Sequence, residues 1–330
     1  MAKGLAVLLG ILLLVPGLGA AEPRVKIGFL VKMPEENWFQ KEWQFAEQAG
    51  KDLGFDVIKI GATDGLKVLS AIDNLAAQGA KGFVICTPDV KLGPAIVSRA
   101  RALGLKVMAV DDQLVGTSGR PLWAVPYLGI SAREIGMAAA SVGWAEMGSR
   151  KWPLEETGAI AISFKELETA RARIAGASTF LDAVGFLGPH IFDAPQKTTD
   201  VEGGFNAANV VITKNPRIRH WLVFALNDES VLGGVQALEG RGFRARDVVG
   251  VGINGMAVAV SELRKATVTG FFGSILLDAK RHGYDTAAMM FDWITLGRLP
   301  PLDTRTKGTV ITRLNYIEVL RSRGLGDLVK

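Results

Sequence analysis

Short apolar runs alternate with amphipathic segments through the first third of the chain. The run from Ile27 to Val31 is long enough for one buried strand, and Glu42 to Leu53 has the spacing of an amphipathic helix that ends at Gly54. The alternation then repeats, which predicts parallel strands with helices on both faces of the sheet. The expected strands are 27–31, 55–60, 83–87 and 105–110, and the expected helices are 42–53, 66–78 and 92–103.

The passage from 113 to 130 is less regular and predicts an edge strand or a crossover. Ser131 is then a candidate N-cap for a helix through Met147, and a second strand–helix series follows. With 330 residues, the chain is therefore predicted to be an α/β protein with two doubly wound parallel-sheet (Rossmann-like) domains. In the second series we expect strands at 159–164, 190–194, 220–226, 248–253, 268–275 and 310–313, and helices at 169–184, 204–214, 229–238, 257–265 and 278–296.

The N-terminus differs from this pattern. Lys3 precedes an apolar run from Leu5 to Leu14, and Pro16 to Ala21 is rich in small residues. Because the apolar run is shorter than the roughly 20 residues of a membrane-spanning helix, residues 1–21 are predicted to be a secretory signal peptide. A retained N-terminal anchor is the alternative. Cleavage would place the mature chain in an extracytoplasmic, oxidising space.

Composition and charge exclude some classes of function. Hydrophobic residues make up 48% of the chain, and the single cysteine, Cys86, lies in an apolar run, so a large core rather than a disulfide must stabilise the fold. A thiol in such a place is expected to act as a small hydrophobe. The formal charge is +5, or +4 without Lys3, and the basic residues are dispersed, which argues against a nucleic-acid surface.

Polar and aromatic side chains gather directly after the first strand. Lys32, Glu36, Trp38 and Phe39 all follow Val31 closely. Carboxylates accept protons from hydroxyl groups, an ammonium donates to ring oxygens, and a flat aromatic face covers the C–H side of a sugar. The stretch therefore predicts a site for a small, polar, ring-shaped ligand, although Lys32 could be an exposed lysine and either aromatic an ordinary core residue.

Other expected strands are also followed by polar groups. Parallel sheets bind ligands outside the carboxyl ends of their strands, where loops and helix N-termini converge. We therefore expect polar residues from both halves to meet in one cleft and to hold several hydroxyl groups at once, although each alone could be a turn or surface residue. These candidates are Asp111, Asp112, Thr169, Arg171, Arg173, Asn227, Asp228 and Asn254.

Other chemistries have weaker support. Residues 250–255 match G-x-G-x-x-G, but the motif comes late in the chain and no acidic residue follows about 20 positions later. No hydrolase or ATPase motif occurs. Asp111 and Asp112 could form a turn or a metal pair, but all three histidines lie far from them in the sequence and no calcium loop is present. No cofactor or metal is expected.

Seven segments carry a family resemblance along the whole mature chain. They are KIGFLVK-x-PEE-x-WFQ, GFVICTPD-x-KLG, VDDQ, LND-x-x-VLGGV, GING, TGFFGS and VITR. In this order they resemble the periplasmic L-arabinose-binding proteins, the sugar-binding subunits of ABC importers. The resemblance implies a type I periplasmic-binding-protein fold with a three-segment hinge. It divides the chain into one domain of 22–130 plus 277–306 and another of 131–276 plus 307–330.

The resemblance also implies residue roles. Trp38 and Phe39 would pack on the sugar, Asp111 and Thr169 would support the site, and Cys86 would lie beside it. Ile130 and Leu226 replace two methionines of the family pattern, Leu277 replaces a hinge proline, and a carboxylate expected soon after Asn254 is missing. The direct polar contacts would come from Lys32, Glu36, Asp112, Arg173, Asn227 and Asn254.

The function implied by the resemblance is binding without catalysis. A monomeric periplasmic protein would close on a monosaccharide and deliver it to a membrane permease, with L-arabinose ranked before D-galactose and D-fucose. A chemoreceptor-coupled sugar sensor would use the same site. A sugar-responsive repressor core would have the same architecture but also an N-terminal helix-turn-helix of about 50–60 residues. A secreted enzyme is the remaining alternative.

Overall fold

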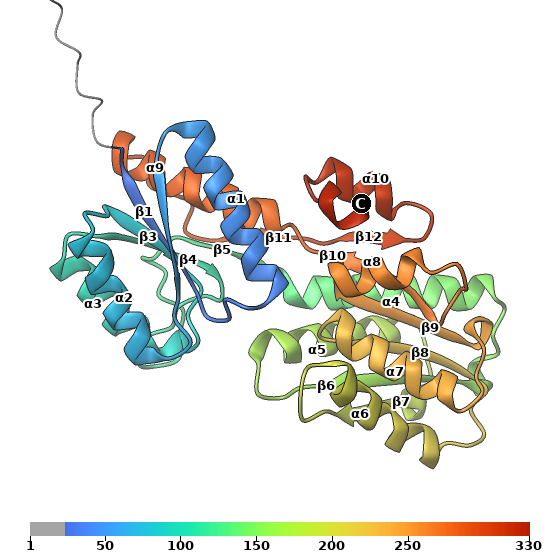
Figure 1. Ribbon diagram of the computed structural model, residues 1–330. Coiled ribbons are helices and arrows are strands. Elements are labelled where there is room, and N and C mark those ends of the chain that lie inside the picture. Colours follow the sequence, from blue (N-terminus) through green and yellow to red (C-terminus); the bar gives the residue numbers. More distant parts are fainter. Residues whose placement is uncertain (1–23) are drawn as a thin grey trace, which may run out of the picture.

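Two six-stranded sheets, one in each of two lobes, form the protein in the computed structural model (Figure 1). The structure describes residues 24–330, so the predicted signal peptide at 1–21 lies outside the described residues. Between residues 24 and 330, no helix is both long enough and apolar enough to cross a membrane. The predicted α/β architecture with two parallel-sheet units is confirmed.

The first sheet contains only parallel strands, in the spatial order β11-β5-β4-β3-β1-β2. Alternate residues of β1 explain why helices cover both faces. Ile27, Phe29 and Val31 are buried in one cluster and Leu30 in another, so neither face of the strand meets water. The strands are β1 (Lys26–Val31), β2 (Asp56–Gly61), β3 (Gly82–Ile85), β4 (Lys106–Asp111), β5 (Tyr127–Ile130) and β11 (Thr304–Thr306).

Four helices cover the first sheet, two on each face. Trp43 of α1 and Met290 of α9 pack in the cluster of Ile27, whereas α2 and α3 pack on the Leu30 face. Helix α1 begins earlier than predicted, at Asn37, and ends as predicted before Gly54, whose φ of 85° suits a residue without a Cβ. The helices are α1 (Asn37–Leu53), α2 (Gly65–Ala77), α3 (Gly93–Ala102) and α9 (Thr286–Leu296).

The second sheet has the order β12-β10-β9-β8-β6-β7, and its strands are parallel except β12, which runs antiparallel to β10. Its faces are also buried in two separate clusters. Ile160 packs with α6 and α7, whereas Ala159 packs with α4 and α5. The strands are β6 (Thr157–Ser163), β7 (Ile191–Pro195), β8 (His220–Ala225), β9 (Val248–Asn254), β10 (Phe271–Leu276) and β12 (Thr309–Thr312).

Helices α4 and α5 cross at unusually short range. A Cβ on Gly136 would lie 1.9 Å from the Arg173 carbonyl oxygen, and one on Gly176 would lie 2.0 Å from the Arg133 carbonyl oxygen. Only glycine permits this approach, which fixes the position of α5 on the sheet. The helices of this lobe are α4 (Ala132–Ser149), α5 (Glu168–Ala183), α6 (Val201–Lys214), α7 (Asp228–Gly240), α8 (Ala257–Arg264) and α10 (Tyr316–Ser322).

Within residues 24–330, the chain passes between the sheets three times, between β5 and β6, between β10 and β11, and between β11 and β12. The helix predicted at 278–296 is interrupted near the second passage by a π-helical turn, Arg281–Asp285. Neither β11 nor α10 was predicted. Strand β11 has the sequence TRT, which contains no apolar run, and it is held by pairing with β5.

Candidate functional site: a cavity between the two sheets

A cavity of about 130 Å³ lies where the carboxyl ends of strands from both sheets face each other. Drug-sized ligands occupy pockets of roughly 300–1,000 Å³, so this cavity suits a small solute. All twelve residues proposed as ligand contacts line it, as do Met33, Leu167, Thr199 and Leu277. The twelve are Lys32, Glu36, Trp38, Phe39, Asp111, Asp112, Ile130, Thr169, Arg173, Leu226, Asn227 and Asn254.

Lys32 and Asp112 form an ion pair on the first-sheet side of the cavity. Burial disfavours the ammonium ion, but the neighbouring acidic groups, Cys86, Asp112 and Asp111, and the hydrogen bond to Asp112 outweigh it and raise the pKa of Lys32 above its usual value. Cys86 lies behind the pair, with its sulfur 3.6 Å from Asp112 Oδ2. Burial also raises the pKa of the Cys86 thiol. Lys32 therefore enters the cavity as a cation and Cys86 as a neutral thiol.

Asp111 has an unusual backbone conformation at the end of β4. Its φ is 60°, in the left-handed region that residues other than glycine seldom occupy. The Tyr127 hydroxyl donates to its carbonyl oxygen over 2.7 Å, and Trp38 Nε1 donates to its side-chain Oδ2 over 3.2 Å. The surrounding hydrogen bonds therefore hold both the Asp111 backbone and the Trp38 indole in place.

The start of α1 brings the aromatic residues to the cavity. Glu36 precedes the helix as its N-cap residue and is exposed at the edge of the cavity, whereas Phe39 is buried. Trp38 is partly buried and packs edge-on against His282, with 5.2 Å between ring centroids. One short turn thus supplies a carboxylate and an indole to the same space.

Arg173 supplies the buried cation of the second-sheet side. Helix α5 carries it into the cavity, where its guanidinium donates to the Leu226 carbonyl oxygen. Burial lowers its pKa to about 10, so it remains charged at neutral pH. Its Nε has no hydrogen-bond partner among residues 24–330. Arg171, two positions earlier, does not line the cavity and binds the Lys165 carbonyl oxygen instead.

Two asparagines complete this side. Asn227 caps α7, since its Oδ1 accepts from the Ser230 backbone N–H over 3.0 Å, and its Nδ2 donates to the Thr199 carbonyl oxygen over 2.7 Å. Asn254 ends β9 with a φ of 116°, outside the usual range for residues other than glycine. Thr199, which the sequence did not single out, thus positions Asn227 through its backbone.

Asp228 lies directly behind the asparagines and is almost fully buried. Its carboxyl group accepts from Ser274 Oγ over 2.5 Å and from the backbone N–H groups of Gly255, over 2.8 Å, and Met256, over 3.4 Å. Burial raises its pKa to about 8. Asp228 does not line the cavity, but it fixes the turn that presents Asn254.

The remaining wall is apolar except for Thr169 in the first turn of α5. Ile130 is the last residue of β5, Leu226 comes directly after β8 and Leu277 directly after β10. All three are buried. Leu167, the N-cap residue of α5, closes the same wall. Branched aliphatic side chains offer no hydrogen-bonding groups, so a ligand must contact this side of the cavity through its C–H groups.

A buried polar cluster behind Asp111 corrects the expectation that no histidine lies near this carboxylate. His282 Nδ1 is 2.6 Å from Asp111 Oδ1, although 171 positions separate the residues, and Glu42 Oε1 is 3.7 Å from the same nitrogen. These residue types could hold a metal ion. However, two ligands about 2.1 Å from one tetrahedral ion lie roughly 3.4 Å apart. The 2.6 Å separation therefore indicates a hydrogen bond.

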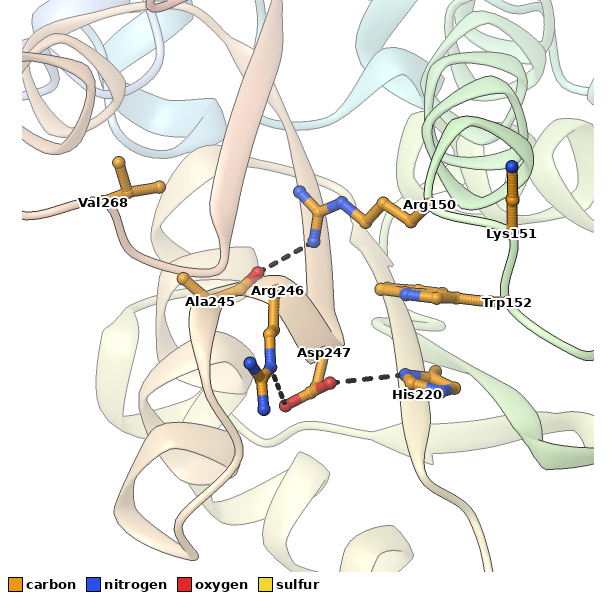
Figure 2. Close-up of a pocket in the computed structure, with 8 residues that line it drawn as sticks. All are labelled: Arg150, Lys151, Trp152, His220, Ala245, Arg246, Asp247 and Val268. Carbon is orange, nitrogen blue, oxygen red and sulfur yellow. Dashed lines mark hydrogen bonds and ion pairs between the residues drawn. The ribbon is translucent and has the colours of Figure 1, made fainter.

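A second hollow, of about 740 Å³, lies at the amino ends of strands in the second sheet (Figure 2). Part of its polar lining is paired internally: Arg150 Nη1 donates to the Ala245 carbonyl oxygen over 2.8 Å, and Asp247 lies 3.5 Å from His220 and 3.9 Å from Arg246. Because parallel sheets bind ligands at the carboxyl ends of their strands, the smaller cavity is the candidate site.

Comparison with known proteins identifies the same family as the sequence resemblance. A sequence profile of the family described as periplasmic binding proteins and sugar binding domain of LacI family matches residues 24–318. The L-arabinose-binding periplasmic protein of Escherichia coli K12 is 50% identical over 308 residues, which cover 93% of each chain. The ABC transporter L-arabinose-binding periplasmic protein of Azospirillum brasilense is 49% identical and covers 94% of this chain and 92% of its own.

A solved structure with low sequence identity has the same fold. The periplasmic ribose ABC transporter protein of Conexibacter woesei superposes with a TM-score of 0.76 at 19% identity. The match covers 92% of this chain and 97% of that one.

Proposed function

Because the chain belongs to the family of periplasmic binding proteins and sugar-binding domains of the LacI family, we propose that it binds a monosaccharide, L-arabinose, in the cavity between its sheets. The observation that carries this proposal is the joint presence, in one small cavity, of ionised and amide side chains from both sheets beside an indole. Relatives about 50% identical over nearly the whole chain bear the name of L-arabinose-binding proteins.

Directed hydrogen bonds would select the sugar. Arg173 has an unpartnered Nε, Lys32 remains an ammonium ion, and Asp112 can accept a hydroxyl proton beside it. Hydrogen bonds to charged groups contribute about 1.5–3 kcal/mol each. A hydroxyl in the wrong configuration would leave one of these buried groups without a partner, so the arrangement discriminates between epimers.

The aromatic and aliphatic walls would bind the C–H surfaces of the same ring. Trp38 is fixed at Nε1 by Asp111, so its apolar face remains available to the cavity. Sugars have one face rich in C–H groups, and an indole covers such a face well. Ile130, Leu226 and Leu277 would limit the space around the ring, and we expect them to rank L-arabinose against D-galactose and D-fucose.

Closure of the two lobes around the sugar would produce the form of the protein that the permease recognises. We assign residues 22–130 and 277–306 to one domain and residues 131–276 and 307–330 to the other. The sugar must bind the closed form more tightly than the open form in order to shift the population. The closed monomer would then deliver its sugar to the permease of an ABC importer in the periplasm, after removal of the signal peptide at 1–21.

Calorimetric titration of the purified mature chain tests the proposal. We expect L-arabinose to bind with a dissociation constant well below about 1 mM, and D-galactose and D-fucose to bind more weakly. D-xylose and D-ribose serve as further epimer controls. Failure of every one of these sugars to bind in the submillimolar range would refute the assignment.

A further inference from the structure

The buried cluster behind Asp111 forms a continuous chain of polar contacts that sugar recognition alone does not explain. His282 is fully buried, with Nδ1 2.6 Å from Asp111 Oδ1 and Nε2 2.8 Å from Thr306 Oγ1. Thr306 Oγ1 in turn lies 3.2 Å from the Gly129 carbonyl oxygen. The imidazole therefore stands between a cavity residue and the last residue of β11.

Counting the protons in this chain assigns a charge to the imidazole. The Gly129 carbonyl can only accept, so the single hydroxyl proton of Thr306 is donated to it. On this assignment, His282 Nε2 donates to Thr306 Oγ1 over 2.8 Å. Asp111 also needs a donor: although burial opposes its ionisation, the hydrogen bond and charge of His282 hold its pKa below the usual value. With both ring nitrogens donating, the hydrogen-bond geometry assigns the ring as an imidazolium ion.

The surrounding charges are consistent with this protonation state. Asp112 pairs with Lys32, and Asp111 lies 2.6 Å from His282, while Arg173 adds a more distant positive charge. Burial, and then the charge of Asp111, raises the pKa of Glu42 well above its usual value, so the third carboxyl group is a neutral acid. Trp38, packed on the ring, adds no charge. A neutral imidazole would leave the buried Asp111 carboxylate without a charged partner in direct contact, which is costly.

The cluster also reaches the segments that pass between the sheets. Thr306 pairs with Ile130 at the end of β5, and its backbone carbonyl accepts from the Ser131 N–H over 2.9 Å. Ser131 begins the first passage and Thr306 is followed by the third. A displacement of the imidazole would therefore be transmitted both to Asp111 and Trp38 in the cavity and to two passages of the chain.

We propose that His282 is a positioning residue of the sugar site: an imidazolium ion that holds Asp111, and through it the Trp38 indole, against the strands that cross between the lobes. The identification of the ligand as a sugar rests on the function proposed above. The charge and contacts of His282 are properties of the protein without sugar. The two claims can therefore fail separately.

Three matched variants test the role in binding. His282→Gln keeps a hydrogen-bonding side chain but loses the charge, and we expect L-arabinose affinity to fall at least about tenfold, the loss of one charge-assisted contact. Glu42→Gln keeps the shape of a neutral acid and should stay within about threefold of wild type. His190→Gln, at a ring whose Nδ1 contacts the Thr157 carbonyl oxygen outside the cavity, should not change affinity.

An affinity of the His282→Gln variant within about threefold of wild type would overturn the proposal. An effect of Glu42→Gln as large as that of His282→Gln would also overturn it, because Glu42 would then be the ionised partner. If His282→Gln does not fold, measurements on the wild-type protein decide the question.

Nitrogen-15 NMR of histidine-labelled protein provides that measurement. At neutral pH without sugar, we expect both ring nitrogens of His282 to be protonated, and the Trp38 indole N–H to shift when His282 is replaced. One unprotonated ring nitrogen would refute the imidazolium assignment. If no sugar binds but both nitrogens are protonated, the proposed function fails while the charge assignment stands.

Discussion

The two sides of the cavity hold their polar groups in different ways. On the first-sheet side, Lys32 and Asp112 are paired charges, and Asp111 is held by His282 from a segment distant in the sequence. On the second-sheet side, Asn227 caps its own helix and Asn254 sits in a turn tied to Asp228. The first side depends on buried charges in direct contact, whereas the second combines one buried cation, Arg173, with asparagines held by hydrogen bonds to and from the backbone, so they should respond differently to substitution.

Removal of the Arg173 charge should have the largest effect. Arg173→Met deletes the buried guanidinium of the second-sheet side and leaves the Leu226 carbonyl oxygen without its donor. We expect L-arabinose affinity, measured by calorimetry, to fall about 100-fold while circular dichroism stays unchanged. Arg171→Met, on the same helix but outside the cavity, is the control. Equal losses in both variants would mean that α5 is merely destabilised.

Removal of the Lys32 charge should have the second-largest effect on affinity. Lys32→Met takes away a donor and leaves Asp112 without its ion-pair partner, so we expect at least about a tenfold loss of affinity and a lower melting temperature. Lys26→Met, at the exposed start of the same strand, should change neither quantity. Wild-type affinity in Lys32→Met would show that the first-sheet side does not contact the ligand.

The buried acid behind the asparagines predicts a pH effect on stability. Because its folded-state pKa is raised to about 8, against about 3.9 in the unfolded chain, Asp228 binds a proton more tightly when folded. Its contribution to the free energy of unfolding therefore decreases as pH rises from about 4 to about 8. Between about pH 5 and about pH 8, the free energy of unfolding of Asp228→Asn should therefore decrease by at least about 1 kcal/mol less than that of the wild type.

Denaturant unfolding of wild type and variant at both pH values measures this difference. Parallel stability changes in the two proteins would contradict a neutral Asp228. The comparison between proteins is needed because other ionisable groups titrate in the same range.

The smallest effect is expected at Cys86. Its sulfur is 3.6 Å from Asp112, a weak contact, and burial keeps the thiol neutral. Cys86→Ala should change affinity less than about threefold, and a thiol reagent should modify the wild-type protein slowly at neutral pH. Rapid modification, or a loss of affinity of about tenfold, would place the thiol among the groups that contact the ligand.

The sequence predicted the parts of this molecule that follow local rules. The spacing of apolar residues, and the turn residues that interrupt it, locate strands such as β1. The rule that parallel sheets bind ligands at the carboxyl ends of their strands predicts that four polar residues meet in one cavity, namely Lys32, Asp112, Arg173 and Asn254. The family resemblance added Ile130 and Leu226, which no local rule marks. Long-range partners were missed: no pattern in the chain connects His282 with Asp111.

Short elements without a pattern were missed for a related reason. Strand β11 is polar and only three residues long, and it exists because β5 offers an edge for pairing. The π-helical turn at Arg281–Asp285 also lies within a stretch that has the periodicity of one continuous helix. In both places, tertiary contacts determine the local conformation.

The succession of β11 and β12 has a consequence for biogenesis. Residues 304–306 add the outer strand beside β5 in one sheet, and residues 309–312 add the outer strand beside β10 in the other. Neither sheet can gain its final edge before this late stretch has been synthesised. Until then, a nascent chain would leave the outer edges of β5 and β10 unpaired, so we expect a truncation before residue 304 to be prone to aggregation.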